Sequence, residues 1–80
     1  MREEPTAVEA TFAADGAITP RRFEWQGSFL DIEGVGRRWT EADQRCFNVV
    51  AMGGRLFELR LDLETLRWSI SRGPIPRLVV

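Results

Sequence analysis

Residues Arg55 to Glu64 form one run in which apolar and charged side chains alternate without a break from Phe57 onward. After Arg55-Leu56, the apolar residues are Phe57, Leu59, Leu61 and Leu63, and the charged residues are Glu58, Arg60, Asp62 and Glu64. Successive side chains of a β-strand point to opposite faces, so the pattern predicts a strand with one buried face and one solvated face. A helix would spread the same leucines around its axis. The alternation resumes from Arg67 to Arg72, which predicts a second strand of the same kind.

The middle of the chain shows the same period of two in shorter runs. Strands are predicted over residues 22–25, 30–33, 37–40 and 45–51. Gln26-Gly27 fits a two-residue hairpin loop, and residues 41–44 and 52–54 are predicted to turn the chain. The paired glycines of Gly34-Val35-Gly36 predict a bulge or a sharp bend, which a small barrel needs at its corners.

Residues 5–16 fit two different elements. Thr6-x-x-Glu9 matches a capping box, and Gly16 could end the helix that such a box begins. As a strand, the same stretch places its apolar residues at positions 8, 10 and 12 on one face. Periodicity alone does not choose between the two in so short a run. Pro20 is expected to mark the start of the next element.

Together these elements predict an all-β fold: a five- or six-stranded antiparallel meander, strongly twisted or rolled into a small barrel. The chain of 80 residues is expected to be one small β domain, and its 44% hydrophobic content is enough for a core. Residues 5–72 are expected to form that core. Residues 73–80 are expected to form a tail, because Gly73-Pro74 interrupts strand structure, and this tail could fray, add an edge strand or donate one to a partner.

The composition argues against catalysis. The chain has no histidine and one cysteine, Cys46, so it lacks the ligands of a zinc site and the base that would activate a thiol. Its glycine segments lack the lysine and the helix start of a phosphate-binding loop. We therefore expect no enzyme activity, no cofactor and no metal.

Three sequence features predict a cytoplasmic protein that does not enter a membrane. A single cysteine cannot form an intrachain disulfide, which suits a reducing compartment. The first residues contain no apolar stretch typical of a secretory signal. No apolar run approaches the about 20 residues that a membrane helix needs.

Arginine provides every basic side chain of this protein, whose formal net charge is −1. Arg37 and Arg38 directly precede Trp39, and Arg45 begins the next predicted strand. These four residues are the candidate contacts for a partner, because guanidinium and indole groups bind anions and flat rings. Trp25, Trp39 and Trp68 are expected to fill the core, and Trp39 is the best candidate for the alternative, an aromatic side chain on the surface.

Three functions fit these candidate contacts. The first is docking onto a protein partner, through an exposed strand edge or through the corner at residues 37–39. The second is direct binding of single-stranded nucleic acid on an arginine and aromatic face, although such domains usually carry a clear positive excess. The third is a homodimer in which the sheet edges of two copies pair. The sequence leaves open whether the protein is a monomer or a homodimer.

A set of aromatic residues and turn glycines also carries a resemblance to known sequences. The motif residues are Pro5-x-x-Val8, Asp15-Gly16, Pro20-x-x-Phe23-x-Trp25-x-Gly27, Leu30-x-Ile32-x-x-Val35-x-x-x-Trp39, Arg45-x-Phe47-x-Val49, Gly54-x-x-Phe57-Glu58-Leu59, Asp62 and Arg67-Trp68-x-Ile70. The chain resembles a small uncharacterised bacterial domain family of unknown function. It is also similar to the short C-terminal domain of the catalytically inactive Y-family polymerase-like proteins of bacterial translesion repair.

The resemblance covers residues 5–72 and consists of core and turn positions, so it specifies fold more than function. It implies that residues 5–16 form a strand rather than a helix. It also implies a non-catalytic module that works near DNA-repair proteins. The family pattern often has tyrosine where this chain has Leu30 and Cys46. No functional residue is established in the family, so the resemblance assigns none here.

Overall fold

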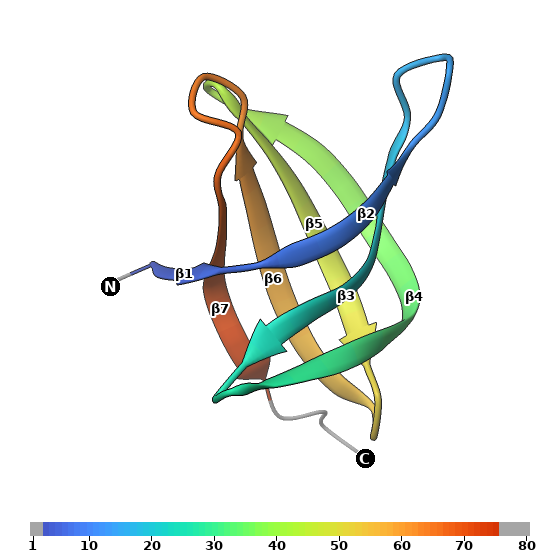
Figure 1. Ribbon diagram of the computed structural model, residues 1–80, viewed down its shortest axis with the longest axis vertical. Helices are drawn as coiled ribbons and strands as arrows, with labels where there is room; N and C mark the ends of the chain where they lie inside the picture. The colour runs from blue at the N-terminus through green and yellow to red at the C-terminus, as the bar shows by residue number, and fades with distance from the viewer. Residues whose placement is uncertain (1–2, 76–80) are drawn as a thin grey trace.

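The computed structural model describes residues 3–75, and within them every regular element is a β-strand. The strands are β1 (Glu4–Thr6), β2 (Val8–Phe12), β3 (Ile18–Trp25), β4 (Ser28–Glu41), β5 (Gln44–Ala51), β6 (Arg55–Asp62) and β7 (Trp68–Ile75). They form one antiparallel sheet in the order β1-β7-β6-β5-β4-β3-β2, curled into a half-barrel (Figure 1). The predicted all-β meander is confirmed, with seven strands in the described residues instead of five or six.

The additional strand arises because the N-terminal stretch is divided into β1 and β2 by Ala7. β1 pairs with β7, whereas β2 pairs with β3 at the other edge of the sheet. The stretch therefore crosses the open side of the half-barrel and joins its two edges (Figure 1). The backbone N–H of Glu24 donates to the carbonyl of Ala7 at 2.9 Å, which ties the junction to β3. Of the two elements that fitted residues 5–16, the strand is the one observed.

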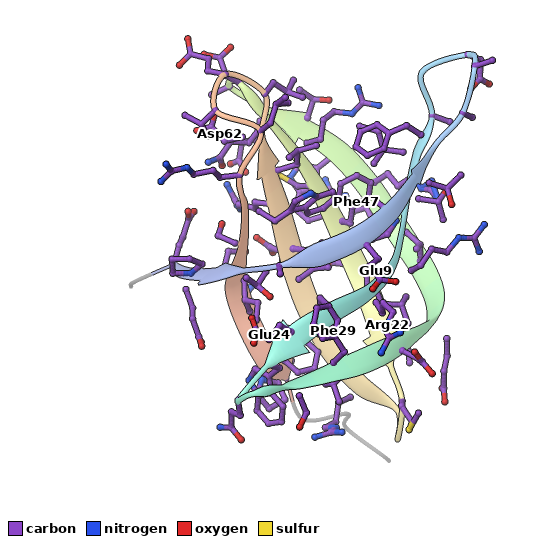
Figure 2. All side chains as sticks on the ribbon, viewed as in Figure 1. Glu9, Arg22, Glu24, Phe29, Phe47 and Asp62 are labelled. Atoms are coloured by element: carbon purple, nitrogen blue, oxygen red, sulfur yellow. The ribbon has the colours of Figure 1, made fainter. Side chains whose placement is uncertain are left out.

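The core lies on the concave face of the sheet, where the apolar positions of the alternating strands meet. It consists of Ile18, Phe23, Phe47, Val49, Ala51, Phe57, Leu59, Leu61 and Ile70, with Trp25 and Trp68 packed against it. Phe57 makes edge-to-face contacts with Phe23 and Trp25, at centroid distances of 4.8 and 5.5 Å. Phe47 lies inside the half-barrel, behind the N-terminal stretch (Figure 2). The tryptophans at 25 and 68 are thus core residues, as predicted.

β6 ends at Asp62, two residues before the predicted end of the alternating run. The Asp62 carboxylate accepts hydrogen bonds from the backbone N–H groups of Glu64 and Thr65, at 2.8 and 3.1 Å. An aspartate that binds the backbone two residues ahead makes a turn, and this turn competes with the strand. Leu63, predicted to be buried, is therefore 42% exposed in the loop.

β3 begins at Ile18, four residues before the strand predicted from residue 22, and it contains Pro20. Pro20 is buried opposite Ala10 of β2, next to a shift in register. Proline lacks a backbone N–H, so it fits a strand only where one side needs no hydrogen bond. That condition holds here, because β3 pairs with β4 only from Arg22 onward.

β4 is the longest strand, and its pairing changes partner along its length. Residues 28–31 pair with β3, and residues 32–41 pair with β5. The register of the β4–β5 ladder shifts between Ile32 and Gly34 and again between Val35 and Arg38. The predicted bulge at the paired glycines is confirmed. The bend carries β4 away from β3, so the second half of β4 has a neighbouring strand on one side only.

β7 continues to Ile75, so Gly73-Pro74-Ile75 belongs to a strand and not to the expected tail. Gly73 has a φ of +131°, and a Cβ built there would lie 2.5 Å from Cδ2 of Phe57. Only glycine both adopts this conformation and leaves room for the buried ring, so glycine is required at this position of the strand. The interruption was predicted because glycine and proline usually break a strand. The expectations for residues 76–80 lie outside the described residues.

Candidate partner-binding surfaces

The strand alternation of β4 places the candidate contacts on two opposite faces of the sheet. Arg38 is paired with Phe47, which faces the core, whereas Trp39 is paired with Cys46 on the outer face. Arg37 lies over the ring of Trp39, with Cζ 4.8 Å from the ring centroid. Arg45 is across from Thr40 and shares the side of Arg38. Arg37 and the pair Arg38 and Arg45 therefore line two different surfaces, and Trp39 lines both.

The first surface is a groove on the outer face of β4, β5, β6 and β7, with a volume of about 470 Å³. We call it the outer groove. Its lining includes the apolar side chains of Trp39, Val50, Leu56 and Ile75, together with Arg37 and Arg72. Val50 pairs with Leu56, and Leu56 pairs with Ile75, so three aliphatic residues from adjacent strands form a continuous row.

The two arginines of the outer groove differ in their surroundings, because Arg72 lies across from Glu58 and its positive charge helps to lower the pKa of that carboxyl. Within residues 3–75, neither Arg37 nor Arg72 forms an ion pair with an acidic side chain. Both side chains are exposed, while the apolar residues between them are half-buried. Glu41 accepts a hydrogen bond from the indole N–H of Trp39 at 3.5 Å, which fixes the edge of that ring.

Glu58 lines the outer groove and belongs to a cluster of polar side chains beside it. Glu58 was predicted to be solvated, but it is only 8% exposed. Its carboxylate accepts hydrogen bonds from Ser71 Oγ at 2.6 Å and from Arg60 Nε at 3.0 Å. Burial pushes the pKa of Glu58 upward, but these hydrogen bonds and the positive charge of Arg60 outweigh it, so the pKa lies below its ordinary value.

Arg60 completes this cluster with contacts to two further residues. Its guanidinium contacts Glu41 at 2.9 Å and donates to the side-chain oxygen of Gln44 at 3.0 Å. The neighbouring Cys46 is fully buried, and desolvation raises the pKa of its thiol. A protonated, buried thiol is a poor nucleophile.

The second surface lies where β3 and β4 separate, and we call it the β3–β4 wedge. It is a cleft of about 280 Å³ lined by Ala17, Ile18, Arg38, Trp39, Thr40, Arg45, Cys46 and Phe47. Within the described part of the chain, neither Arg38 nor Arg45 forms an ion pair with an acid. Its floor is apolar, because Ile18 and Phe47 belong to the core.

The remaining arginines of the middle strands are engaged elsewhere. Arg22 lies 4.0 Å from Glu9 and 3.8 Å from Asp31, with its Cζ 5.0 Å from the ring centroid of Phe29 (Figure 2). Arg55 lies over the ring of Trp25, at 5.1 Å. These arginines do not extend either candidate surface.

Sequence reasoning missed half of the outer groove. Val50 and Leu56 occupy positions on the solvated faces of their predicted strands, where the alternation calls for polar residues. Two apolar residues on the wrong faces of neighbouring strands are a usable signal of an exposed apolar patch. Ile75 gave no such signal, because residues 73–80 were assigned to a tail. Arg72 ends the strand predicted over residues 67–72 and was not singled out.

Comparisons with known proteins give no further guide to this site. No family model, no curated protein and no solved structure matches the chain. Among residues 3–75, no three metal-ligating side chains of His, Cys, Asp or Glu gather in one place. The described region also contains no helix of the length and apolarity that a membrane crossing requires.

Proposed function

We propose that this protein is a non-catalytic docking module that binds a segment of a protein partner in the outer groove. The observation that carries the proposal is the aliphatic row of Val50, Leu56 and Ile75 between two unpaired arginines, Arg37 and Arg72. An exposed apolar surface rimmed by charge is typical of a protein-binding site.

The groove defines the chemistry of the partner segment. An apolar side chain would cover the aliphatic row and remove it from water, which supplies affinity. Acidic side chains on either side would pair with Arg37 and Arg72, and arginine binds carboxylates with two parallel hydrogen bonds. Glu58 does not oppose such a segment strongly, because its charge is compensated by Arg60 and Ser71.

The outer groove suits a protein better than single-stranded nucleic acid. Nucleic-acid platforms leave aromatic faces open for bases to stack on them, whereas Arg37 already covers one face of Trp39. An aliphatic floor offers bases no stacking partner. The arginines also lie on two faces of the sheet, so they do not form one track for a phosphate backbone.

The resemblance to the C-terminal domain of inactive translesion polymerase-like proteins supports a partner from bacterial DNA repair, in the cytoplasm. That resemblance comes from core and turn positions, so it suggests the setting of the interaction and not its contacts. The proposal places those contacts on residues that the resemblance does not assign.

A pull-down with matched charge reversals tests this function. The bait is the full chain, offered to a lysate of its source organism, and bound proteins are identified by mass spectrometry. The double variant Arg37→Glu, Arg72→Glu should lose the specific partner, because acidic groups then face acidic groups. The control Arg67→Glu changes an equally exposed arginine in the β6–β7 loop and should retain that partner.

The same chain, labelled for backbone amide NMR, is then titrated with a single-stranded oligonucleotide at low and moderate salt. No shifts at low salt are expected. Shifts at Arg37 and Trp39 that fade as salt rises would establish nucleic-acid binding instead, because phosphate contacts weaken steeply with salt.

Light scattering over a range of protein concentrations tests for a homodimer. If the measured mass doubles, and the variant Arg37→Glu, Arg72→Glu stays a monomer, then a second copy of the chain occupies the outer groove.

A further inference from the structure

The β3–β4 wedge exposes strand edges that face each other across a gap. The β3–β4 ladder runs only from Trp25↔Ser28 to Arg22↔Asp31. Beyond it, the first residues of β3 pair with β2 alone, and residues 33–41 of β4 pair with β5 alone. Figure 1 shows the two strands running apart above this point. Each side that faces the gap therefore presents backbone groups without a strand partner in the described residues.

The side chains at the wedge carry charge without a counterpart. Arg38 and Arg45 are diagonal neighbours on one face of the β4–β5 ladder, since Arg38 pairs with Phe47 and Arg45 with Thr40. Both line the same cleft, and neither has an acidic partner among residues 3–75. Two like charges on neighbouring positions repel each other, and one carboxylate placed between them removes that repulsion.

We infer that the unpaired side of β4 receives an extended segment of a protein partner, with an acidic side chain directed at Arg38 and Arg45. Strand addition to an exposed edge derives affinity from main-chain hydrogen bonds and specificity from alternate side chains. The segment's acidic side chain would sit on the concave side, beside the apolar floor of Ile18 and Phe47. The arginines of the wedge lie on the opposite face of β4 from Arg37, although Trp39 lines both clefts. The inference uses Arg38, Arg45 and the unpaired side of β4, so it does not rest on the proposed function.

The backbone chemistry favours a peptide over nucleic acid at this edge. A free strand edge offers both N–H donors and C=O acceptors, and another strand satisfies both kinds. A phosphate backbone only accepts hydrogen bonds, so it would leave the carbonyls of β4 without partners. Arginines on one side of the edge then select among extended peptides by charge.

The probe for this site is a displayed library of random peptides, selected on the immobilised full chain. We expect the selected peptides to be extended sequences with alternating apolar positions and an acidic residue. Added to the labelled protein, a selected peptide should slow hydrogen exchange of amides in residues 33–41. The variant Arg38→Glu, Arg45→Glu should weaken the peptide at least about tenfold, because like charges across an interface are strongly unfavourable. The outer-groove variant Arg72→Glu, which changes a residue of β7 away from the wedge, should bind it unchanged.

Several results would overturn the inference. One is a library that yields no binder, and another is a set of binders without acidic residues. A third is a binder that is lost with the outer-groove variant and retained by the wedge variant. Because charge reversal at Arg38 and Arg45 could unfold the protein, far-ultraviolet circular dichroism is recorded for each variant. The hydrogen-exchange map on the unmodified protein decides the question without any variant, since unchanged exchange in residues 33–41 also contradicts strand addition.

Discussion

The β5–β6 hairpin and the strand β4 lie side by side, yet they are built differently. β5 and β6 pair from Gln44↔Asp62 to Ala51↔Arg55 without a register shift, and each has a strand on its other side as well. β4 has two register shifts, and its second half has a strand on one side only. The hairpin contributes most of the fully buried side chains, whereas no residue of β4 is fully buried.

Under the proposed function, this difference separates the part of the molecule that supplies stability from the part that binds the partner. A regular ladder with buried alternation holds the half-barrel together through the hydrophobic effect. A bulged strand with an unpaired side leaves its backbone and its arginines free for a partner. Substitutions in the hairpin should therefore change the free energy of unfolding, and substitutions on β4 should change binding.

The largest effect on stability is expected in the hairpin core. Leu59→Ala removes a fully buried side chain and should lower the free energy of unfolding by about 2–5 kcal/mol. The matched change on β4, Val35→Ala, removes less from a half-buried position and should cost less. Urea unfolding followed by tryptophan fluorescence measures both. Equal losses would contradict the division between hairpin and β4.

The next largest effect is expected where β7 crosses the core of the hairpin. Gly73→Ala forces a Cβ against the ring of Phe57 and the carbonyl of Leu56, in a left-handed conformation, and should cost about 2–4 kcal/mol. Gly16→Ala shares the positive φ, but its Cβ would meet open space, so only the backbone cost of about 1 kcal/mol remains. Thermal unfolding of the two variants separates the cost of the contact from that of the backbone. If Gly73→Ala lowers the stability less than Gly16→Ala does, the Phe57 ring moves aside to make room for the added Cβ.

A smaller effect, dependent on pH, is expected on the outer face of the hairpin. Glu58→Gln weakens charge-assisted hydrogen bonds with Ser71 and Arg60 and should cost about 1–3 kcal/mol at pH 7. The pKa of Glu58 is lower in the folded protein than its ordinary value of 4.5. Its contribution is therefore complete above that value and is lost as the pH falls through the folded pKa. Unfolding free energies measured from pH 7 to pH 2 should converge for the two proteins, and a constant difference would contradict this assignment.

The smallest effects on stability are expected at the arginines of β4. Arg37→Ala and Arg38→Ala alter exposed side chains without ion pairs and should change the free energy of unfolding by less than about 0.5 kcal/mol. Each should nevertheless weaken partner binding at its own surface, which isothermal titration calorimetry measures once a ligand is in hand. A large loss of stability from either change would assign that arginine a structural role.

Regular alternation was the part of the sequence that predicted structure well. The faces of β5 and the core half of β6 were correct because the strand period is two and one face is buried. Errors came where a local interaction competes with that period. Asp62 folds the chain into a turn, and Gly73 permits a strand to continue past a proline. Neither effect follows from the hydrophobic pattern. The turn depends on hydrogen bonds to the Asp62 side chain, and the glycine at position 73 lies against the ring of Phe57.

The contacts named from the sequence stay predictions, and their arrangement in the fold was not foreseen. Adjacent positions such as Arg38 and Trp39 alternate faces in a strand, so a cluster in the sequence becomes two surfaces in the fold. The burial of Glu58 also escaped prediction, because its partner Ser71 comes from another strand. Long-range neighbours of this kind depend on the register between strands, which a single sequence does not specify.

The N-terminal stretch has a consequence for how the protein is made. β2 meets β3 as soon as residues up to 23 exist, but β1 must wait for β7, more than 60 residues later. Such distant pairing closes a long loop, and proteins rich in these contacts fold in about milliseconds to seconds. Until β7 arrives, β1 remains an unpaired strand, open to the matching edge of another copy. We therefore predict that the pairing of β1 with β7 is the step at which two chains would exchange their N-terminal strands.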